Sequence, residues 1–410
     1  MGSAVIAVGA VSFCTDISSE MVTAVLPLFL ITQIGLSPLG YGVIDGLYQG
    51  VTVAVRLAGG YLADRFRHPK LVCLIGYGMS ALSRLGLPQV GSATAAGLVI
   101  AVDRTGKGLR TAPRDAIIAG STDQASLGRA FGVHRALDTA GAMLGPLLAF
   151  ALLSSVPGSY NSVFVTSFAV AVVGLAVLVL FVPNARTRHS ATTQVSIRRV
   201  LRLLRQRRIA ALVGAAGLLG MLTVSDGFVY LRLQRQLAVS TDVFPLLAAG
   251  MSAAYLLLAV GAGRLADRVG RWRMFLSGHV ALLGAYLVLL APAAGALTCV
   301  ACLALVGAYY AATDGVLAAA AAETLPGYLR GSGLALVQTA VAAGRLTSSV
   351  LFGLLWTVLG GQRQALAIFA GALLVGLPVA WRLLARSRSV PPPADGCPKR
   401  ELLGCRQCGS

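Results

Sequence analysis

Charged residues are scarce in this sequence, and acidic ones are fewer than half as numerous as basic ones. Only 12% of the 410 residues are charged and 56% are hydrophobic, with 15 acidic residues against 34 basic ones. A soluble domain carries about 25% charged residues. No soluble core could enclose this much apolar surface, so we expect lipid to be the solvent around most of the chain.

Signals for several other classes of protein are also lacking. The first apolar stretch, about residues 4–30, has no basic start and no cleavage site. It is longer than the roughly 7–15 residues of a signal-peptide core, so we expect it to be retained as a helix. The chain has no GxxxxGK[ST] loop that could cradle nucleotide phosphates. Neither a nucleotide nor another cofactor is therefore expected.

The net charge and the cysteines do not predict a nucleic-acid or metal partner. The net charge is +19, but the basic residues cluster between apolar runs, as in cytoplasmic loops of membrane proteins. They are not interleaved with aromatic residues as on a nucleic-acid-binding surface. Four of the seven cysteines lie in apolar runs and are expected to pack there. The polar tail holds a single CxxC pair, Cys405 and Cys408, which is not enough to predict a metal site.

The apolar runs are long enough to cross a membrane as helices. A spanning helix needs about 20 mostly apolar residues, and its backbone must satisfy its own hydrogen bonds in the hydrocarbon. A membrane barrel would instead show short alternating segments. Twelve helical segments are predicted, at residues 4–33, 41–62, 70–88, 95–119, 128–155, 161–182, 209–237, 243–265, 272–291, 296–322, 331–359 and 364–385.

One short motif occurs twice, 203 residues apart. It reads GYLADR at residues 60–65 and GRLADR at residues 263–268, and each copy opens a basic stretch. The same offset pairs Gly141 with Gly344. A repeat this long in so apolar a chain indicates two homologous membrane halves, the pattern of a transporter built from parallel repeats.

The two sets of six helices and the repeated motif resemble the Major Facilitator Superfamily (MFS) over about residues 4–385. Arg104 and Gly108 match the Arg-x-x-x-Gly motif of its fourth helix. A fifth-helix motif, which the family associates with antiporters, is matched by Gly132, Gly141, Gly145 and Pro146. The resemblance implies an all-α membrane protein with the MFS fold, twelve transmembrane helices in two six-helix pseudo-repeats.

The sequence departs from the family's motifs in places and is similar to a narrower group in others. Arg67 stands where the first loop motif has glycine, and Ala149 and Phe150 replace the last glycines of the fifth-helix motif. Residues 16–21, 103–116 and 134–141 resemble a bacterial subgroup whose fourth helix reads DRTGKGLRTAPRDA. This narrower resemblance implies a class of mechanism and no particular cargo.

Four regions are predicted along the chain. They are an N-terminal six-helix bundle (1–182), a basic linker (183–208), a C-terminal six-helix bundle (209–385) and a tail (386–410). The linker has eight arginines and no acid, and we expect either a basic helix on the anionic inner leaflet or a solvated connection. The Lys/Arg bias predicts that both termini and the linker face the cytoplasm, in a multi-pass protein of the inner membrane.

Acidic residues on two helices of the first half are candidates for proton coupling. Asp16 and Glu20 share one face of the first helix, with Asp16 about 18 Å deep at 1.5 Å per residue. One of two neighbouring carboxylates can take up a proton, although a structural pair with arginines of the fourth helix is the alternative. His134 and Asp138 are four residues apart on the fifth helix and can meet; a static cytoplasmic gate is the alternative there.

Candidates for contact with the cargo come from both halves. A charge inside the bilayer costs about 2.5–3.5 kcal/mol on insertion scales, so it pairs with another group or has a function. Ion pairing within the first half is the alternative role for its cations, and packing is the alternative for the tyrosine. The candidates are Arg104, Lys107, Arg110, Asp226, Tyr310, Asp314 and Gln338.

The resemblance also implies residues that control conformation. The aspartates of the two loop motifs should pair with basic residues and helix N-termini of the other half, and so hold one face shut. The implied gating residues are Gly60, Asp64, Arg65, Gly263, Asp267, Arg268, Gly141, Gly145 and Pro146.

The expected function is secondary active transport of a small organic solute by alternating access, carried out by a monomer. Proton-driven export is the first choice, and import of a carboxylated metabolite or siderophore held by Arg104 and Arg110 is the second. A polytopic membrane enzyme or a transport-dead receptor is a different class. The second copy of the loop motif argues against both, because an enzyme does not need it.

Overall fold

The computed structural model describes residues 3–66, 68–123, 126–183, 204–292, 295–324 and 330–388. Within these ranges every regular element is a helix. Most of the predicted linker and nearly all of the predicted tail lie outside the described residues, and so does the possible basic helix in the linker.

Six long helices form the first half of the molecule. α1 lies at its centre and packs against α5 and α6, while α2 and α3 both pack against α4. Proline begins α2 and α3, in the first turn, where its missing N–H is not needed. The helices are α1 (Ser3–Thr32), α2 (Pro38–Phe66), α3 (Pro69–Gly86), α4 (Ala93–Gly120), α5 (Leu127–Ser155) and α6 (Tyr160–Phe181), and a 3-10 turn at Leu87–Gln89 extends α3.

The second half repeats this plan with two of its helices interrupted. α8 packs against α14 as α1 packs against α5, and α10 and α11 both pack against α12. The helices are α8 (Arg207–Met221), α9 (Asp226–Leu237), α10 (Pro245–Val269), α11 (Arg271–Leu290), α12 (Ala296–Thr313), α13 (Val316–Thr324), α14 (Arg330–Leu359) and α15 (Gln362–Arg388).

The predicted segments at residues 209–237 and 296–322 are each found as one candidate span, but each is interrupted by a break. The first is broken between α8 and α9, where the Tyr286 hydroxyl accepts from the Val224 N–H at 2.7 Å and donates to the Leu222 carbonyl at 3.1 Å. The side chain thus satisfies backbone groups that the helix leaves free, as a break inside a membrane requires. The second is broken at Gly315, whose positive φ of 76° favours glycine.

In the part of the chain that the structure describes, ten segments are long and apolar enough to cross a membrane. α2 and α4 are not among the ten, although they are of similar length, because both carry several charged residues. Large apolar side chains face outward, with Leu257 83% and Leu297 82% exposed, as expected for contact with lipid. The all-helical membrane fold is confirmed, and the count of twelve spans stays a prediction.

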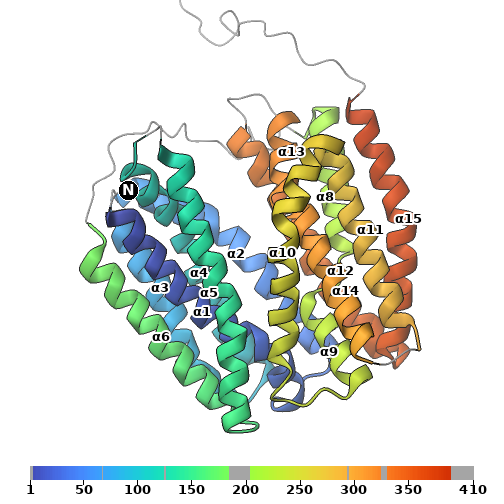
Figure 1. The fold of residues 1–410 in the computed structure, drawn as a ribbon, viewed down its shortest axis with the longest axis horizontal. Coiled ribbons are helices and arrows are strands. Elements are labelled where there is room, and N and C mark those ends of the chain that lie inside the picture. The colour runs from blue at the N-terminus through green and yellow to red at the C-terminus, as the bar shows by residue number, and fades with distance from the viewer. Residues whose placement is uncertain are drawn as a thin grey trace, which may run out of the picture.

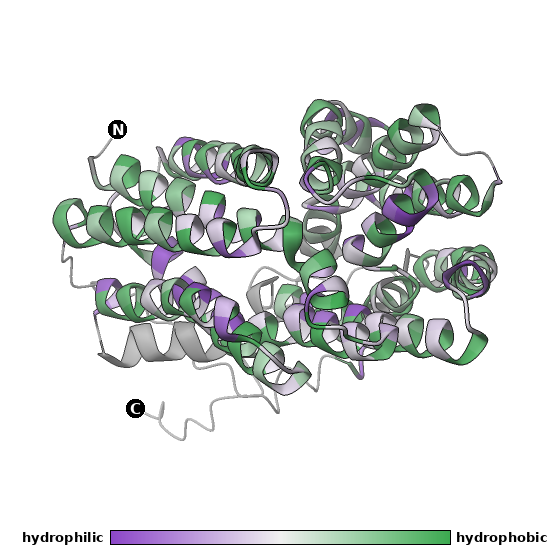
Figure 2. Cartoon of the chain, turned by 90° about the horizontal axis from the view of Figure 1, so that it is seen from below, coloured by the Kyte–Doolittle hydropathy of each residue, from purple (hydrophilic) through white to green (hydrophobic). Residues whose placement is uncertain are grey.

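The two halves lie side by side, with the N-terminus and the last turns of α15 at the same end of the molecule (Figure 1). The main contacts between the halves are those of α2 with α14 and of α5 with α10, and α1 also contacts α9 and α10. Viewed from below, green hydrophobic residues dominate both halves and the purple hydrophilic residues are few (Figure 2). The interface between the two halves is therefore where polar side chains of both halves could form one site.

One end of the α2–α14 contact is tightly packed. A Cβ built on Gly42 or on Gly353 would collide with the backbone of the opposing helix, at Ser349 and at Pro38 respectively. Only glycine allows the two backbones to lie this close. The Leu39 N–H also donates to the Thr357 hydroxyl at 3.2 Å. We call this region, at the start of α2 and the end of α14, the closed end.

Candidate transport site

Two cavities lie between the halves. The larger, which we call the central cavity, has a volume of about 760 Å³ and is lined by helices of both halves, including Leu317 and Ala318 of α13. The smaller, the closed-end pocket, has a volume of about 120 Å³ and lies beside the closed end. Glu20 and Gln49 line both, so the two spaces adjoin. A small solute therefore has room at the interface between the halves.

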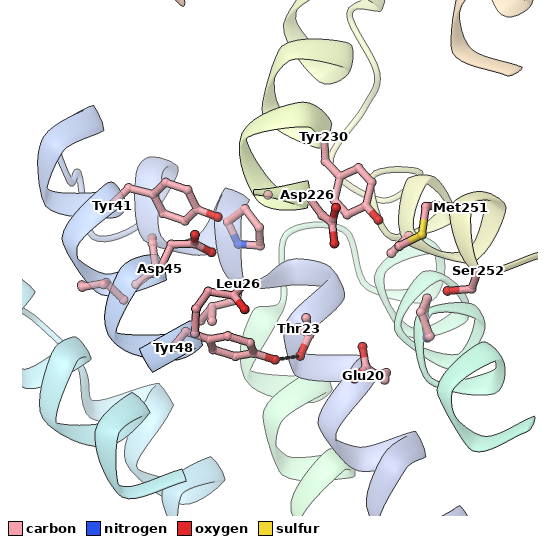
Figure 3. A pocket seen from close by; sticks show the side chains of 17 residues that line it. Glu20, Thr23, Leu26, Tyr41, Asp45, Tyr48, Asp226, Tyr230, Met251 and Ser252 are labelled. Carbon is pink, nitrogen blue, oxygen red and sulfur yellow. Dashed lines mark hydrogen bonds between the residues drawn. The ribbon is translucent and has the colours of Figure 1, made fainter. Parts of the chain in front are cut away.

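Polar side chains of both halves point into the closed-end pocket (Figure 3). Asp45 of α2 accepts a hydrogen bond from the Ser349 hydroxyl of α14 at 2.5 Å, which links the halves. Tyr48 of α2 is 2.9 Å from the Thr23 hydroxyl of α1. The pocket is thus bounded by hydroxyl and carboxyl groups, and its Asp45 contact holds the two halves together.

Asp16 of α1 meets Asp138 of α5. Each of the two carboxyl groups lies within electrostatic reach of the other. Asp138 also lies 3.7 Å from Arg114 and 3.9 Å from Arg135. The structure therefore brings together one residue from each of the two predicted proton-coupling pairs.

The predicted contact between His134 and Asp138 is not formed. His134 is buried, and within the described part of the chain neither ring nitrogen has a hydrogen-bond partner. The spacing of four residues puts both side chains on α5 in the same general direction, but Asp138 turns toward cations and toward Asp16. Helical spacing alone could not show which neighbouring helix would supply these groups.

Arg104 belongs to a buried ion cluster within the first half. Asp103 pairs with Arg84 at 2.6 Å and also with Arg104, and both arginines are buried. The Arg104 guanidinium lies 3.9 Å from the centre of the Tyr48 ring. Arg104 is absent from the described linings of the central cavity and the closed-end pocket. Its position matches the ion-pairing alternative better than contact with cargo.

The other two cations proposed for substrate binding face different surroundings. Lys107 lines the central cavity. Arg110 is buried, with its guanidinium 4.4 Å from the centre of the Tyr77 ring of α3. The three cations of α4 therefore have different surroundings. Only Lys107 of the three is positioned to meet a solute in either cavity.

The second half supplies a linked set of polar groups. Tyr310 donates to the Asp226 carboxylate at 2.9 Å, and Arg345 donates to the Tyr309 hydroxyl at 3.2 Å. The Arg345 guanidinium lies 5.5 Å from the centre of the Tyr310 ring. Asp226 lines the closed-end pocket, and the other three line the central cavity.

Asp314 and Gln338 both line the central cavity. Asp314 pairs with Arg135 of the first half at 3.2 Å, and the Tyr255 hydroxyl donates to it at 3.4 Å. Asp314 thus forms a bridge between the halves at the cavity. Its predicted contact with the cargo stays a prediction, because a bridge of this kind can open.

The gating residues fall into three groups. Gly60, Asp64 and Arg65 lie in α2, but the side chains of residues 56–67 are outside the described part. Gly263, Asp267 and Arg268 lie in the last turns of α10, and Asp267 pairs with Arg271 of its own half at 3.4 Å. Gly141 and Gly145 lie against the backbone of α1, and Pro146 lines the closed-end pocket.

Several residues of the site were not among the predicted ones. Asp45 and Arg345 are charged residues within apolar stretches of their helices. A charge in such a stretch is the sequence signal that could have predicted them. Gln49, Tyr48 and Tyr230 carry no such signal, because a neutral polar residue is common in membrane helices. Among the described residues no group of three or more His, Cys, Asp or Glu side chains could hold a metal ion.

Comparison with known proteins identifies the family. The family model described as Major Facilitator Superfamily matches residues 8–233 and 227–401. An uncharacterized MFS-type transporter of Methanocaldococcus jannaschii is 30% identical over 382 residues, which cover 90% of this chain and 93% of the relative. An uncharacterized protein of Mycobacterium tuberculosis is 30% identical over 131 residues, 32% of each chain.

Solved structures share the fold at low sequence identity. The nucleoside transporter NupG superposes with a TM-score of 0.79 at 15% identity, covering 92% of this chain and 98% of its own. The peptide transporter POT in complex with sulfate gives a TM-score of 0.78 at 14% identity, covering 94% and 95%.

The fold, the cavity between two repeated halves and these matches define a multi-pass membrane transporter rather than an enzyme. The chain belongs to the Major Facilitator Superfamily. Its two family-model matches, one to each half, agree with the 203-residue repeat in the sequence.

Proposed function

We propose that this protein is a secondary active transporter that exports a small organic solute across the cytoplasmic membrane in exchange for protons. The central cavity between the halves supports alternating access, because it is bounded at one end by the close α2–α14 contact. We propose a monomer, since one chain contributes both linings of the cavity.

The orientation rests on the basic residues. The central linker and the loop motifs are rich in Lys and Arg, which favours the cytoplasm for that end of the molecule. The N-terminus lies at the same end as α13 (Figure 1). With this orientation the central cavity faces the cytoplasm, and the closed end faces outward. Reporter fusions after residues 190 and 390 should both read cytoplasmic; an external signal at either would reverse the proposal.

The proximity of the Asp16 and Asp138 carboxyl groups, on α1 and α5, is the observation that supports proton coupling. Two carboxyl groups on different helices can share one proton and release it when the helices or their cation neighbours shift. Glu20 lies four residues from Asp16 and lines both cavities, so it can exchange a proton with the solvent of the cavity. The proton site and the cargo space are therefore adjacent on α1.

An infrared experiment tests the shared proton without any cargo. Purified protein should show the carbonyl-stretch band of a protonated carboxyl near neutral pH, and Asp16→Asn and Asp138→Asn should each remove it. Asp267→Asn is the matched control, because Asp267 pairs with Arg271 at 3.4 Å in the other half and lies outside the two cavity linings. A band that survives in both Asp16→Asn and Asp138→Asn would place the proton elsewhere.

A transport experiment tests the coupling itself. Everted membrane vesicles with an imposed pH gradient are given amino acids, dipeptides, nucleosides and organic amines, and collapse of the gradient is followed with a pH-sensitive dye. At least one compound should collapse the gradient with wild-type protein, and Asp16→Asn or Glu20→Gln should abolish this, with exchange of the labelled compound persisting in Asp16→Asn. Wild-type proton movement in both variants would move the coupling site, with His134 and Asp138 next to be tested.

A further inference from the structure

The first-half lining of the central cavity carries an acid and a base that are both without a partner. Glu20 of α1 and Lys107 of α4 line this cavity, and Gln49 of α2 lies with them. Within the described ranges, neither charged side chain takes part in a hydrogen bond or an ion pair. The two side chains are more than 4.0 Å apart, so they form no ion pair with each other. These two charges are available to a ligand.

The other charges around the cavity are already engaged. Arg135 pairs with Asp314, and Asp226 accepts from Tyr310. Arg345 donates to a tyrosine hydroxyl. Among the described residues, the cavity therefore offers one free negative and one free positive group, both on the same half, and the opposite lining is polar but internally bonded. A ligand with a net positive or net negative charge could pair with only one of Glu20 and Lys107. It would leave the other either repelled by a like charge or unpaired.

Alternating access makes this arrangement costly when the cavity is empty. In the occluded state the cavity closes at both ends, and Glu20 and Lys107 lose their contact with bulk water. An ion that is buried without a partner is strongly disfavoured, whereas one that meets an opposite charge with good geometry is not. A solute that carries both an ammonium and a carboxylate group would supply a partner to each side chain at once.

We propose that the cargo is a zwitterion, whose ammonium group binds Glu20 and whose carboxylate binds Lys107. The apolar body of the solute would lie against Val53 and, across the cavity, Leu334 and Val341. Binding of an ammonium group and binding of a proton at Glu20 exclude one another, so the cargo and the proton compete for one carboxylate. This assignment rests on the proposed transport function, because it names the solute class for the same cavity.

Thermal unfolding of the purified full chain in detergent tests this assignment. The probes are apolar α-amino acids and their dipeptides, each compared with its methyl ester, which lacks the carboxylate, and its N-acetyl derivative, which lacks the ammonium group. A ligand that binds the folded state raises the unfolding temperature by mass action. We expect at least one zwitterion to bind, with its two blocked derivatives weaker by about 10- to 100-fold, the range for loss of a bond to a charged group.

Two variants locate the two charges. In Lys107→Gln the zwitterion should bind no better than its methyl ester, and in Glu20→Gln no better than its N-acetyl derivative. Asp115→Asn should keep the full discrimination. The comparison of derivatives on wild-type protein needs no variant, so it remains decisive if a substitution impairs folding.

Three results would overturn the assignment. They are no stabilisation by any zwitterion of the panel, equal binding of zwitterions and blocked derivatives, or discrimination that survives in both Glu20→Gln and Lys107→Gln. The second result would mean that neither the ammonium nor the carboxylate group of the solute meets a partner in the cavity.

The binding assay uses no proton gradient and measures no transport. Zwitterion binding without gradient-driven movement would leave the assignment standing and reject the transport proposal. Proton-driven movement of some other solute, with no zwitterion bound, would do the reverse.

Discussion

The two halves of this protein share their packing and differ in their chemistry. On α5, a Cβ at Gly141 would come within 2.5 Å of the Phe13 carbonyl of α1. On α14, 203 residues later, a Cβ at Gly344 would come within 2.5 Å of the Gly217 carbonyl of α8. The same close helix contact is therefore built twice, at matched positions of the repeat.

The charged groups do not follow the repeat. At the same offset, Asp103 corresponds to Val306 and Lys107 corresponds to Tyr310. Glu20 corresponds to Thr223, which lies in the break between α8 and α9. Where the first half places a free carboxylate in a continuous helix, the second half interrupts the helix. Close packing fixes the shape of each bundle, and side chains at the interface are free to diverge.

The largest expected effect comes from the ion cluster that only the first half contains. Asp103→Asn leaves Arg84 and Arg104 buried without their carboxylate, and removing one partner of a buried pair costs about 3–5 kcal/mol. The matched change Val306→Ala deletes two methyl groups, which is worth about 1.5 kcal/mol. Thermal unfolding of both variants in detergent measures the difference. Equal losses would mean that the cluster contributes no more than ordinary packing.

The second effect should be equal in the two halves. Gly141→Ala and Gly344→Ala each place a methyl group against a helix backbone, and such overpacking costs about 1–3 kcal/mol. Gly132→Ala and Gly214→Ala are controls, since a Cβ there has no neighbour within 4 Å and alanine favours the helix by about 1 kcal/mol. Unfolding temperatures should fall for the first pair and not for the second. A loss confined to one half would break the packing symmetry.

The third effect compares the two copies of the loop motif. Asp64→Asn should slow transport strongly in a folded protein, if its charge holds the cytoplasmic side closed; a carboxylate near a helix N-terminus contributes about 0.3–1 kcal/mol. Asp267→Asn should have less effect, because Asp267 is exposed and pairs with Arg271 in its own half. Initial rates in vesicles, normalised to folded protein, give the comparison. Normal rates with Asp64→Asn would remove this motif from the mechanism.

The smallest effect on stability concerns the bridge between the halves. Arg135 and Asp314 are 66% and 51% exposed, and an exposed ion pair is worth about 0.2–1 kcal/mol. Arg135→Gln, Asp314→Asn and the double variant form a cycle that isolates this coupling by thermal unfolding. A coupling well above 1 kcal/mol would show that the bridge stabilises this conformation more than its exposure suggests.

Particular residues show where sequence reasoning succeeded. The family, the all-helical membrane fold and the repeat followed from apolar length and from two copies of GxLADR. Lys107, Asp226, Tyr310, Asp314 and Gln338 were proposed for contact with the cargo; all five line a cavity, and that contact stays a prediction. Arg104 carried the family motif, yet it lies in the Arg84–Asp103 cluster. A motif identifies a position in the family and does not say which neighbours complete it.

The sequence by itself determined that this chain forms helices in a membrane and that its two halves are alike. The reason is that lipid cannot satisfy a backbone N–H or C=O group, so a long apolar run has the helix as its solution. Only the tertiary structure decided which charges are partnered. Asp16 reaches Asp138 of α5, while Glu20 and Lys107 face the cavity. Spacing along one helix fixes which side chains share a face, but the helix packed against that face decides what they meet.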